Sequence, residues 1–171
     1  MILRDRLQPA LLDRLTDLAP LSQLEADDAR VMNKSQIRDA VLRDLSWLLN
    51  SVQPLGKEAL SYPQAADSVL NYGLPAMSGQ MASRVDVSLL EKAIKHAILR
   101  FEPRVMEDSL EVKALDAGSV LDTHNVIEFE IRGFMWAQPV PLELLLRTQV
   151  DLEAGQVEVR DMGNAPSRRR P

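Results

Sequence analysis

The chain has no cysteine among its 171 residues, so disulfides and thiolate chemistry are excluded. This absence fits a reducing compartment. No stretch of about 18 uninterrupted apolar residues is present, which argues against a membrane-spanning helix. Charged residues interrupt the opening "MILRDRLQPALLDRL" every few positions. We therefore expect neither a signal peptide nor direct insertion into a membrane.

Common catalytic and metal-binding patterns are also missing. There are only two histidines, His96 and His124, and without cysteine they make no recognisable zinc set. The nucleophile motif G-x-S-x-G and the phosphate-binding glycine loops are absent. A magnesium site made only of carboxylates stays open, but 25 acidic residues make chance clusters such as Asp27–Asp28 easy. We predict no catalytic residue, no cofactor and no metal site.

The net charge of −5 makes nucleic acid a poor partner for this surface. The one basic cluster is Arg168–Arg170, close to the end of the sequence. We interpret it as a solvated, frayed end, and an electrostatic contact with an acidic partner is the alternative.

Helical spacing dominates the first half of the chain. A leucine stripe (Leu7, Leu11, Leu12, Leu15 and Leu18) predicts an N-terminal helix, followed by an acidic, irregular connection. We expect an arm over residues 1–30, one domain over 31–162 and a basic, disordered tail over 163–171. A second helix is predicted from Asn33 or Ser35 to about Asn50, with Asn33 and Gln36 as a capping box and Asp39 paired with Arg43.

A third helix is predicted to start near residues 86–88, with Ser88 and Glu91 as its capping box, and to end at Pro103. The stretch "SVLNYGLP", residues 68–75, precedes it. We interpret this stretch as a fold determinant, with Leu70, Tyr72 and Leu74 in the core and an unusual backbone angle at Gly73.

From Met106 onward the apolar period switches to two, which predicts strands. They are expected around residues 110–114, 127–136, 142–152 and 157–159. Beyond Gly133 the alternation changes phase, since Phe134 and Trp136 are the next large apolar residues, and a bulge at Gly133 explains the change. The predicted fold is α+β, with N-terminal helices packed on one face of a mostly antiparallel C-terminal β-sheet. The last strand is short and is expected to be an open edge.

The helix-to-strand junction is Glu102-Pro103-Arg104, an acid, a helix breaker and a base. In a structural interpretation, Arg104 folds back onto the last helical carbonyls and Glu102 pairs with it. In a functional interpretation, Pro103 fixes the turn so that both charges face a partner. Sequence physics alone favours the structural interpretation. As a glycosidase acid, Glu102 is poorly placed, because Arg104 tends to lower its pKa, the wrong direction for that role.

Three ordered stretches carry a resemblance: "RDLSWLLN" at 43–50, "SVLNYGLP" at 68–75 and "AILRFEPRV" at 97–105. The ending "LRTQVDLEAGQVEV" adds a closing hairpin. Over roughly residues 5 to 160, the chain resembles the TssE family, the small baseplate subunit of type VI secretion systems. That family is similar to the T4 phage baseplate wedge protein that starts sheath assembly.

The resemblance implies a structural, non-enzymatic protein of the cytoplasmic baseplate. It implies binding to the wedge proteins TssF and TssG, with TssK as a further candidate partner, and strand addition by the sheath proteins TssB and TssC at an open sheet edge. It also implies that Glu102, Pro103 and Arg104 hold the subunit in the baseplate. With the resemblance included, we therefore prefer the functional interpretation, in which the three residues form an interface, over the structural one. The two interpretations can coexist. A lysozyme-like glycoside hydrolase acting on peptidoglycan and a regulatory binding module are the alternatives.

Overall fold

The computed structural model describes residues 9–16, 20–21, 32–55, 61–76, 86–115, 126–137 and 139–163. In these residues the helices precede the strands, which confirms the α+β class. The helical elements are α1 (Leu11–Leu15), α2 (Lys34–Leu49), α3 (Pro63–Ala66), η3 (Val69–Asn71), α4 (Val87–Phe101) and η5 (Glu107–Ser109). The strands are β1 (Glu111–Ala114), β2 (Val126–Met135), β3 (Leu142–Asp151) and β4 (Gln156–Asp161). The Asp27–Asp28 pair, His124 and the Arg168–Arg170 cluster lie outside the described residues.

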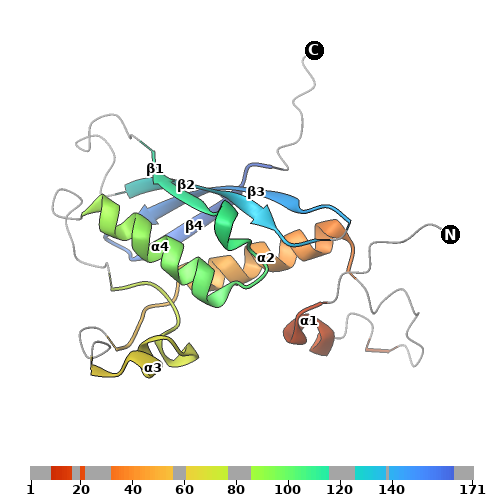
Figure 1. Ribbon diagram of the computed structural model, residues 1–171, viewed down its shortest axis with the longest axis horizontal. Helices are drawn as coiled ribbons and strands as arrows, with labels where there is room; N and C mark the ends of the chain where they lie inside the picture. The colour runs from red at the N-terminus through yellow and green to blue at the C-terminus, as the bar shows by residue number, and fades with distance from the viewer. Residues whose placement is uncertain are drawn as a thin grey trace, which may run out of the picture.

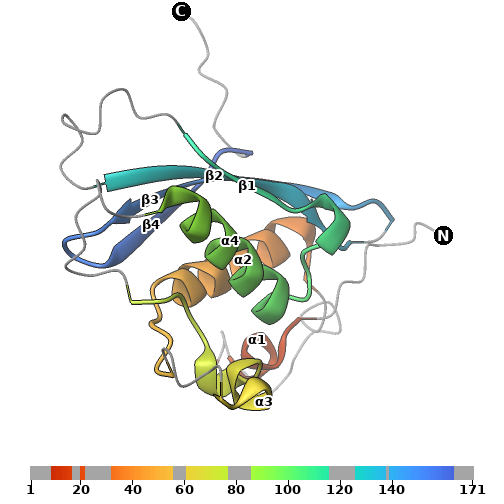
Figure 2. The same cartoon turned by 60° about the vertical axis from the view of Figure 1, so that its left-hand side comes forward.

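The four strands form one antiparallel sheet in the order β1-β2-β3-β4. Figure 1 shows α2 and α4 side by side against one face of this sheet. In Figure 2, α1 and α3 lie on the side of these helices that faces away from the sheet. None of the described helices combines the length and apolarity needed to cross a membrane.

The core fills the space between the sheet and the two long helices. Phe129 and Ile131 of β2 are fully buried, and burying a side chain of this size stabilises the fold by roughly 1.5–3 kcal/mol. Strand β3 contributes the face that the sequence predicts, with every second residue from Leu144 buried (Leu144, Leu146, Thr148 and Val150), and Leu152 directly after the strand is buried too. The helices contribute their own apolar stripes (Ile37, Val41, Leu45, Leu48, Leu90, Ile94, Ala97 and Ile98).

The register between β2 and β3 has no irregularity. Partners advance one residue at a time from Val126 opposite Asp151 to Met135 opposite Leu142. The predicted bulge at Gly133 is therefore wrong, because a bulge places two residues opposite one. Met135 continues the buried face, and the side chains of Phe134 and Trp136 are exposed.

The helix starts are only partly as predicted. The capping box at α2 is confirmed: Asn33 Oδ1 accepts from the Gln36 N–H, and Gln36 Oε1 accepts from the Asn33 N–H, both at 2.9 Å. At α4 the predicted start near residues 86–88 is confirmed, but the capping box of Ser88 and Glu91 is wrong. Asp86 is the cap, and its carboxylate accepts from the backbone N–H groups of Ser88 and Leu89.

The stretch 68–75 is anchored to the loop that follows α2. The Leu74 N–H donates to the Ser51 carbonyl at 2.8 Å, and the Gln53 N–H donates to the Leu74 carbonyl at 2.8 Å. Gly73 has φ +119°, and a Cβ at this position would lie 2.3 Å from the Ser51 carbonyl oxygen, so glycine is required. Leu74 is buried as predicted, but Leu70 is 68% exposed, which corrects its placement in the core.

Candidate interaction site

Pro103 converts the end of α4 into a tight turn. The Glu102 N–H donates to the Ile98 carbonyl, which is the last helical hydrogen bond. The Val105 N–H then donates to the Glu102 carbonyl at 3.1 Å. This places Pro103 at the second position of a four-residue turn, where its fixed φ is preferred. Pro103 itself is exposed to solvent.

Within the turn, Glu102 and Arg104 pair with each other. The Arg104 guanidinium donates from Nε to Glu102 Oε1 at 2.7 Å and from Nη2 to Oε2 at 2.5 Å. The Arg104 backbone N–H adds a bond to Oε1 at 3.1 Å. Only 3% of Glu102 is exposed. Burying a carboxylate is costly unless it is hydrogen-bonded, and these three hydrogen bonds offset that cost.

A second carboxylate completes the environment of Arg104. Asp44 of α2 accepts from Arg104 Nη2 at 2.5 Å through Oδ2. Among the described residues, the guanidinium bonds to these two carboxylates and not to the last carbonyls of α4. The pairing of the structural interpretation is therefore present, and the fold-back onto the helix end is not.

The contacts continue from Asp44 to α1. Asp44 Oδ1 accepts from Arg43 Nε at 2.9 Å and from Nη2 at 2.8 Å. Arg43 Nη1 donates to Asp13 Oδ1 at 2.6 Å. We call these five residues (Asp13, Arg43, Asp44, Glu102 and Arg104) the ion network. It joins α1, α2 and the turn after α4.

The network raises the pKa of both arginines. For Arg104, burial acts to lower the pKa, but the hydrogen bonds and charges of Glu102 and then Asp44 outweigh it and the pKa rises. The pKa of Arg43 is raised chiefly by its hydrogen bond to Asp13 and further by Asp44. Both guanidinium groups therefore carry a positive charge at neutral pH.

The aromatic residue Tyr72 lies close to the same carboxylates. Its ring meets Phe101 of α4 edge-on, with centroids 5.2 Å apart. Burial raises the pKa of Tyr72, and the negative charges of Asp44 and Glu102 raise it further. The stretch 68–75 thus braces the end of α4, one residue before the turn.

The 102–104 turn exposes less charge to a partner than the sequence Glu102-Pro103-Arg104 indicates. Glu102 is turned inward, and 27% of the Arg104 side chain remains accessible. The exposed parts are the Pro103 ring and the outer side of Arg104. The assignment of Glu102, Pro103 and Arg104 to an interface stays a prediction, in which Glu102 acts through the shape of the turn.

The hydrolase alternative is not favoured by this geometry. A general acid must point its carboxyl group into a substrate cleft and give up a proton. Both carboxylate oxygens of Glu102 instead accept hydrogen bonds from the partly buried guanidinium of Arg104. Within the described residues, no group of three or more acidic or histidine side chains is arranged to hold a metal ion.

Sequence reasoning missed Asp13 and Asp44 and misassigned Arg43. It paired Arg43 with Asp39 one helical turn away, whereas the guanidinium bonds to Asp13 and to its neighbour Asp44. Arg43 also lies over the ring of Trp47, 5.1 Å from its centroid. The sequence carried no clear signal for the bond between Arg43 and Asp44, because adjacent residues of a helix do not normally face each other.

Comparison with known protein families identifies the family of the chain. A family model described as "Baseplate wedge protein gp25" matches residues 35–140, more than half of the chain. The chain belongs to the baseplate wedge protein gp25 family. Its role is therefore that of a structural component of a phage-tail-like baseplate. Neither the curated proteins nor the solved structures gave a match. The range matched by the gp25 model contains the 102–104 turn and Asp44, and it ends before β3.

Proposed function

We propose that this protein is the baseplate subunit of a cytoplasmic type VI secretion machine that binds the TssF–TssG wedge and starts the sheath. The observation that carries the proposal is the gp25-family match over the part of the chain that builds the 102–104 turn. The ion network holds this turn rigid, and a preformed surface loses less entropy on binding. TssK is a further candidate contact in the same assembly.

Sheath initiation by strand addition requires a free sheet edge. At the β4 edge, the side chain of Asn50 mimics a strand: its Oδ1 accepts from the Val157 N–H at 2.9 Å, and its Nδ2 donates to the Val157 carbonyl at 2.8 Å. Backbone groups alternate in direction along an antiparallel strand. Val159 therefore directs its N–H and carbonyl to this same side, beyond the reach of the Asn50 bonds.

The β1 edge is shorter and partly blocked. Strand β1 has four residues, and the outward N–H of Ala114 donates to Glu91 of α4 at 2.6 Å. By the same alternation, Val112 is the other outward-facing residue of this strand. We therefore assign strand addition by TssB and TssC to β4, starting at Val159.

The wedge proposal is tested by co-purifying the wild-type chain with co-expressed TssF and TssG. A stable complex of the three proteins is expected. A wild-type chain that remains folded and never associates with the wedge refutes the wedge proposal.

The edge assignment is tested with proline, which removes one N–H and is tolerated where that N–H faces solvent. Val159→Pro blocks the β4 edge, and Val112→Pro is the matched change at the β1 edge. We expect the first to abolish sheath assembly on purified baseplates and the second to preserve it, while both proteins keep the wild-type circular dichroism spectrum. The opposite pattern assigns sheath initiation to β1.

A further inference from the structure

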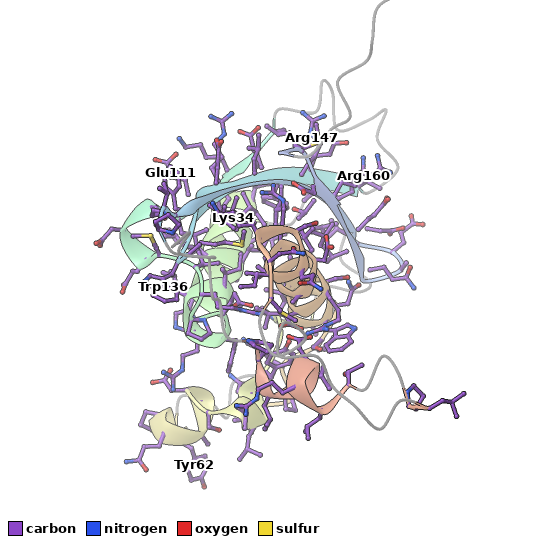
Figure 3. All side chains as sticks on the ribbon, turned by 90° about the vertical axis from the view of Figure 1, so that its right-hand side faces the viewer. Lys34, Tyr62, Glu111, Trp136, Arg147 and Arg160 are labelled. Carbon is purple, nitrogen blue, oxygen red and sulfur yellow. The ribbon has the colours of Figure 1, made fainter. Side chains whose placement is uncertain are left out.

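The unbroken register of β2 leaves two aromatic side chains outside the core. Phe134 is 47% exposed and Trp136 is 56% exposed. Large aromatic residues are costly to leave in water and are enriched at protein interfaces. Figure 3 shows Trp136 on the outer flank of the molecule.

Met106 extends this surface across the neighbouring segment. Val105 pairs with Met135 in an antiparallel bridge, which places Met106 directly opposite Phe134. The Met106 N–H donates to the Phe134 carbonyl at 2.8 Å, and the side chain of Met106 is 39% exposed. We call Met106, Phe134 and Trp136 the apolar patch.

The apolar patch is continuous with the 102–104 turn. The Trp136 N–H donates to the carbonyl of Arg104 at 2.7 Å. Ser109 Oγ accepts from the Phe134 N–H at 2.9 Å and donates to the Met106 carbonyl at 2.7 Å. The ion network and these bonds therefore fix the backbone of the turn and of the apolar patch as one rigid unit.

Acidic side chains border the apolar patch. Glu107 and Asp108 directly follow Met106 and are exposed, and Glu143 is the cross-strand neighbour of Phe134. Within the described part of the chain, neither Glu107 nor Asp108 forms an ion pair. The two guanidinium groups beside the apolar patch are already engaged, Arg104 by Glu102 and Asp44, and Arg132 by Glu130.

These observations narrow the class of partner. A strand cannot add here, because the N–H groups of Met106, Phe134 and Trp136 are already hydrogen-bonded. A second copy docking its own apolar patch in a two-fold arrangement brings the acidic borders together, which is repulsive. An anionic membrane surface is disfavoured for the same reason. An amphipathic helix with basic residues beside its apolar stripe fits this surface, because its apolar side chains can pack on the aromatic residues and its basic side chains can pair with the acidic border.

We propose that the apolar patch is the docking surface for an amphipathic, Lys/Arg-flanked helix of a baseplate partner, which packs on Phe134 and Trp136. This inference rests on the proposed function, since it names the surface through which the TssF–TssG wedge is bound. In this arrangement the Glu102–Arg104 pair positions the surface, and the aromatic side chains supply most of the affinity.

The test measures binding of the co-expressed TssF–TssG wedge to the full chain. Phe134→Ser and Trp136→Ser are each expected to weaken binding at least about tenfold. Leu70→Ser is the control, because Leu70 is an apolar residue on η3 that is more exposed than either Phe134 or Trp136. Melting curves for all variants show whether the fold is retained.

Two outcomes separate this inference from the proposed function. If the wild type binds the wedge and both patch variants bind as tightly, the docking surface is refuted and the wedge proposal stands. If the wild type does not bind the wedge, both proposals fail. A loss of binding shared equally by Leu70→Ser also refutes the assignment to the apolar patch.

Charge and cross-linking test the nature of the partner. The double variant Glu107→Lys/Asp108→Lys is expected to weaken binding about tenfold at low salt, and unchanged or tighter binding refutes the basic flank. A photo-reactive benzoylphenylalanine at Phe134 is expected to cross-link to a wedge segment with apolar residues three or four positions apart. The same group at Tyr62 serves as the control. Cross-links to a second copy of this chain, or to a segment without that spacing, refute the helix.

Discussion

The pairing of Glu102 with Arg104 leads to a quantitative prediction for a double-mutant cycle. Arg104→Ala removes two of the three hydrogen bonds to a carboxylate that is 3% exposed. Breaking a buried ion pair in this way costs roughly 3–5 kcal/mol. Because the Arg104 side chain is partly accessible and the backbone bond to Oε1 remains, we expect a loss of about 3 kcal/mol in the free energy of unfolding. For a chain of this size, the melting temperature then falls by about 6–12 °C.

The reverse substitution is expected to cost less. Glu102→Ala leaves Arg104 with Asp44 and some solvent, so we expect a loss of about 2 kcal/mol. The double variant buries no unpaired charge, and its loss should fall short of the sum by about 2 kcal/mol. Urea denaturation at pH 7, followed by tryptophan fluorescence and circular dichroism, measures all four corners of the cycle.

The chain contains its own control for this experiment. Glu158 and Arg160 of β4 repeat the Glu-x-Arg spacing and pair at 2.8 Å on the outer face of the sheet. Both side chains are more than half exposed, so solvent and salt screen the pair. Arg160→Ala should leave the urea midpoint unchanged. If Arg104→Ala is as mild as Arg160→Ala, or if the cycle at the turn is additive, burial does not strengthen the pair and the reasoning fails.

Three further predictions concern Gly73, Asp161 and the two aspartates of the ion network. Gly73→Ala should destabilise the fold by more than about 2 kcal/mol in urea, because its Cβ meets the Ser51 carbonyl and its φ is positive. A hydrogen bond from Arg38 lowers the pKa of Asp161, so the stability it provides is present above about pH 4 and is lost as the pH falls through the folded-state pKa. Melting temperatures of Asp161→Asn should therefore lie below those of the wild type at pH 7 and approach them at acidic pH. Asp44→Ala should cost more free energy of unfolding than Asp13→Ala, since Asp44 serves two arginines and Asp13 serves one.

Much of the fold follows from periodicity, because a buried face requires it. The alternation in β3 and the stripes of α2 and α4 appear in the structure as predicted. The error at Gly133 has a physical source: the sequence method assumes that large apolar residues face the core. At Phe134 and Trp136 that assumption hides an exposed surface, and only the register with β3 reveals it.

The candidate site was predictable in its position and not in its contacts. Glu102-Pro103-Arg104 marks a junction, since a proline after an apolar stripe ends a helix. No sequence spacing indicates that Asp44, 60 positions from Arg104, completes the environment of the guanidinium. Likewise, the leucine stripe of the N-terminal helix predicts that α1 packs against the rest of the protein through its leucine side chains. In the structure Leu11 and Leu15 face outward, and the inward contact is Asp13.

The junction after α4 has two parts: the ion network, which fixes the backbone, and the apolar patch, which is exposed to solvent. Buried charge pairs add little net stability compared with apolar packing, but they fix geometry, because an unpaired buried charge is strongly penalised. The ion network thereby fixes the turn in one conformation, and the backbone bonds of Met106, Phe134 and Trp136 extend this rigidity to the apolar patch. If the apolar patch binds the partner as proposed, we expect a substitution in Glu102-Pro103-Arg104 to weaken binding by displacing aromatic side chains that the substituted residue does not contact. For this reason, loss of binding in Arg104→Ala identifies Arg104 as a direct contact only if the apolar patch is shown to keep its position.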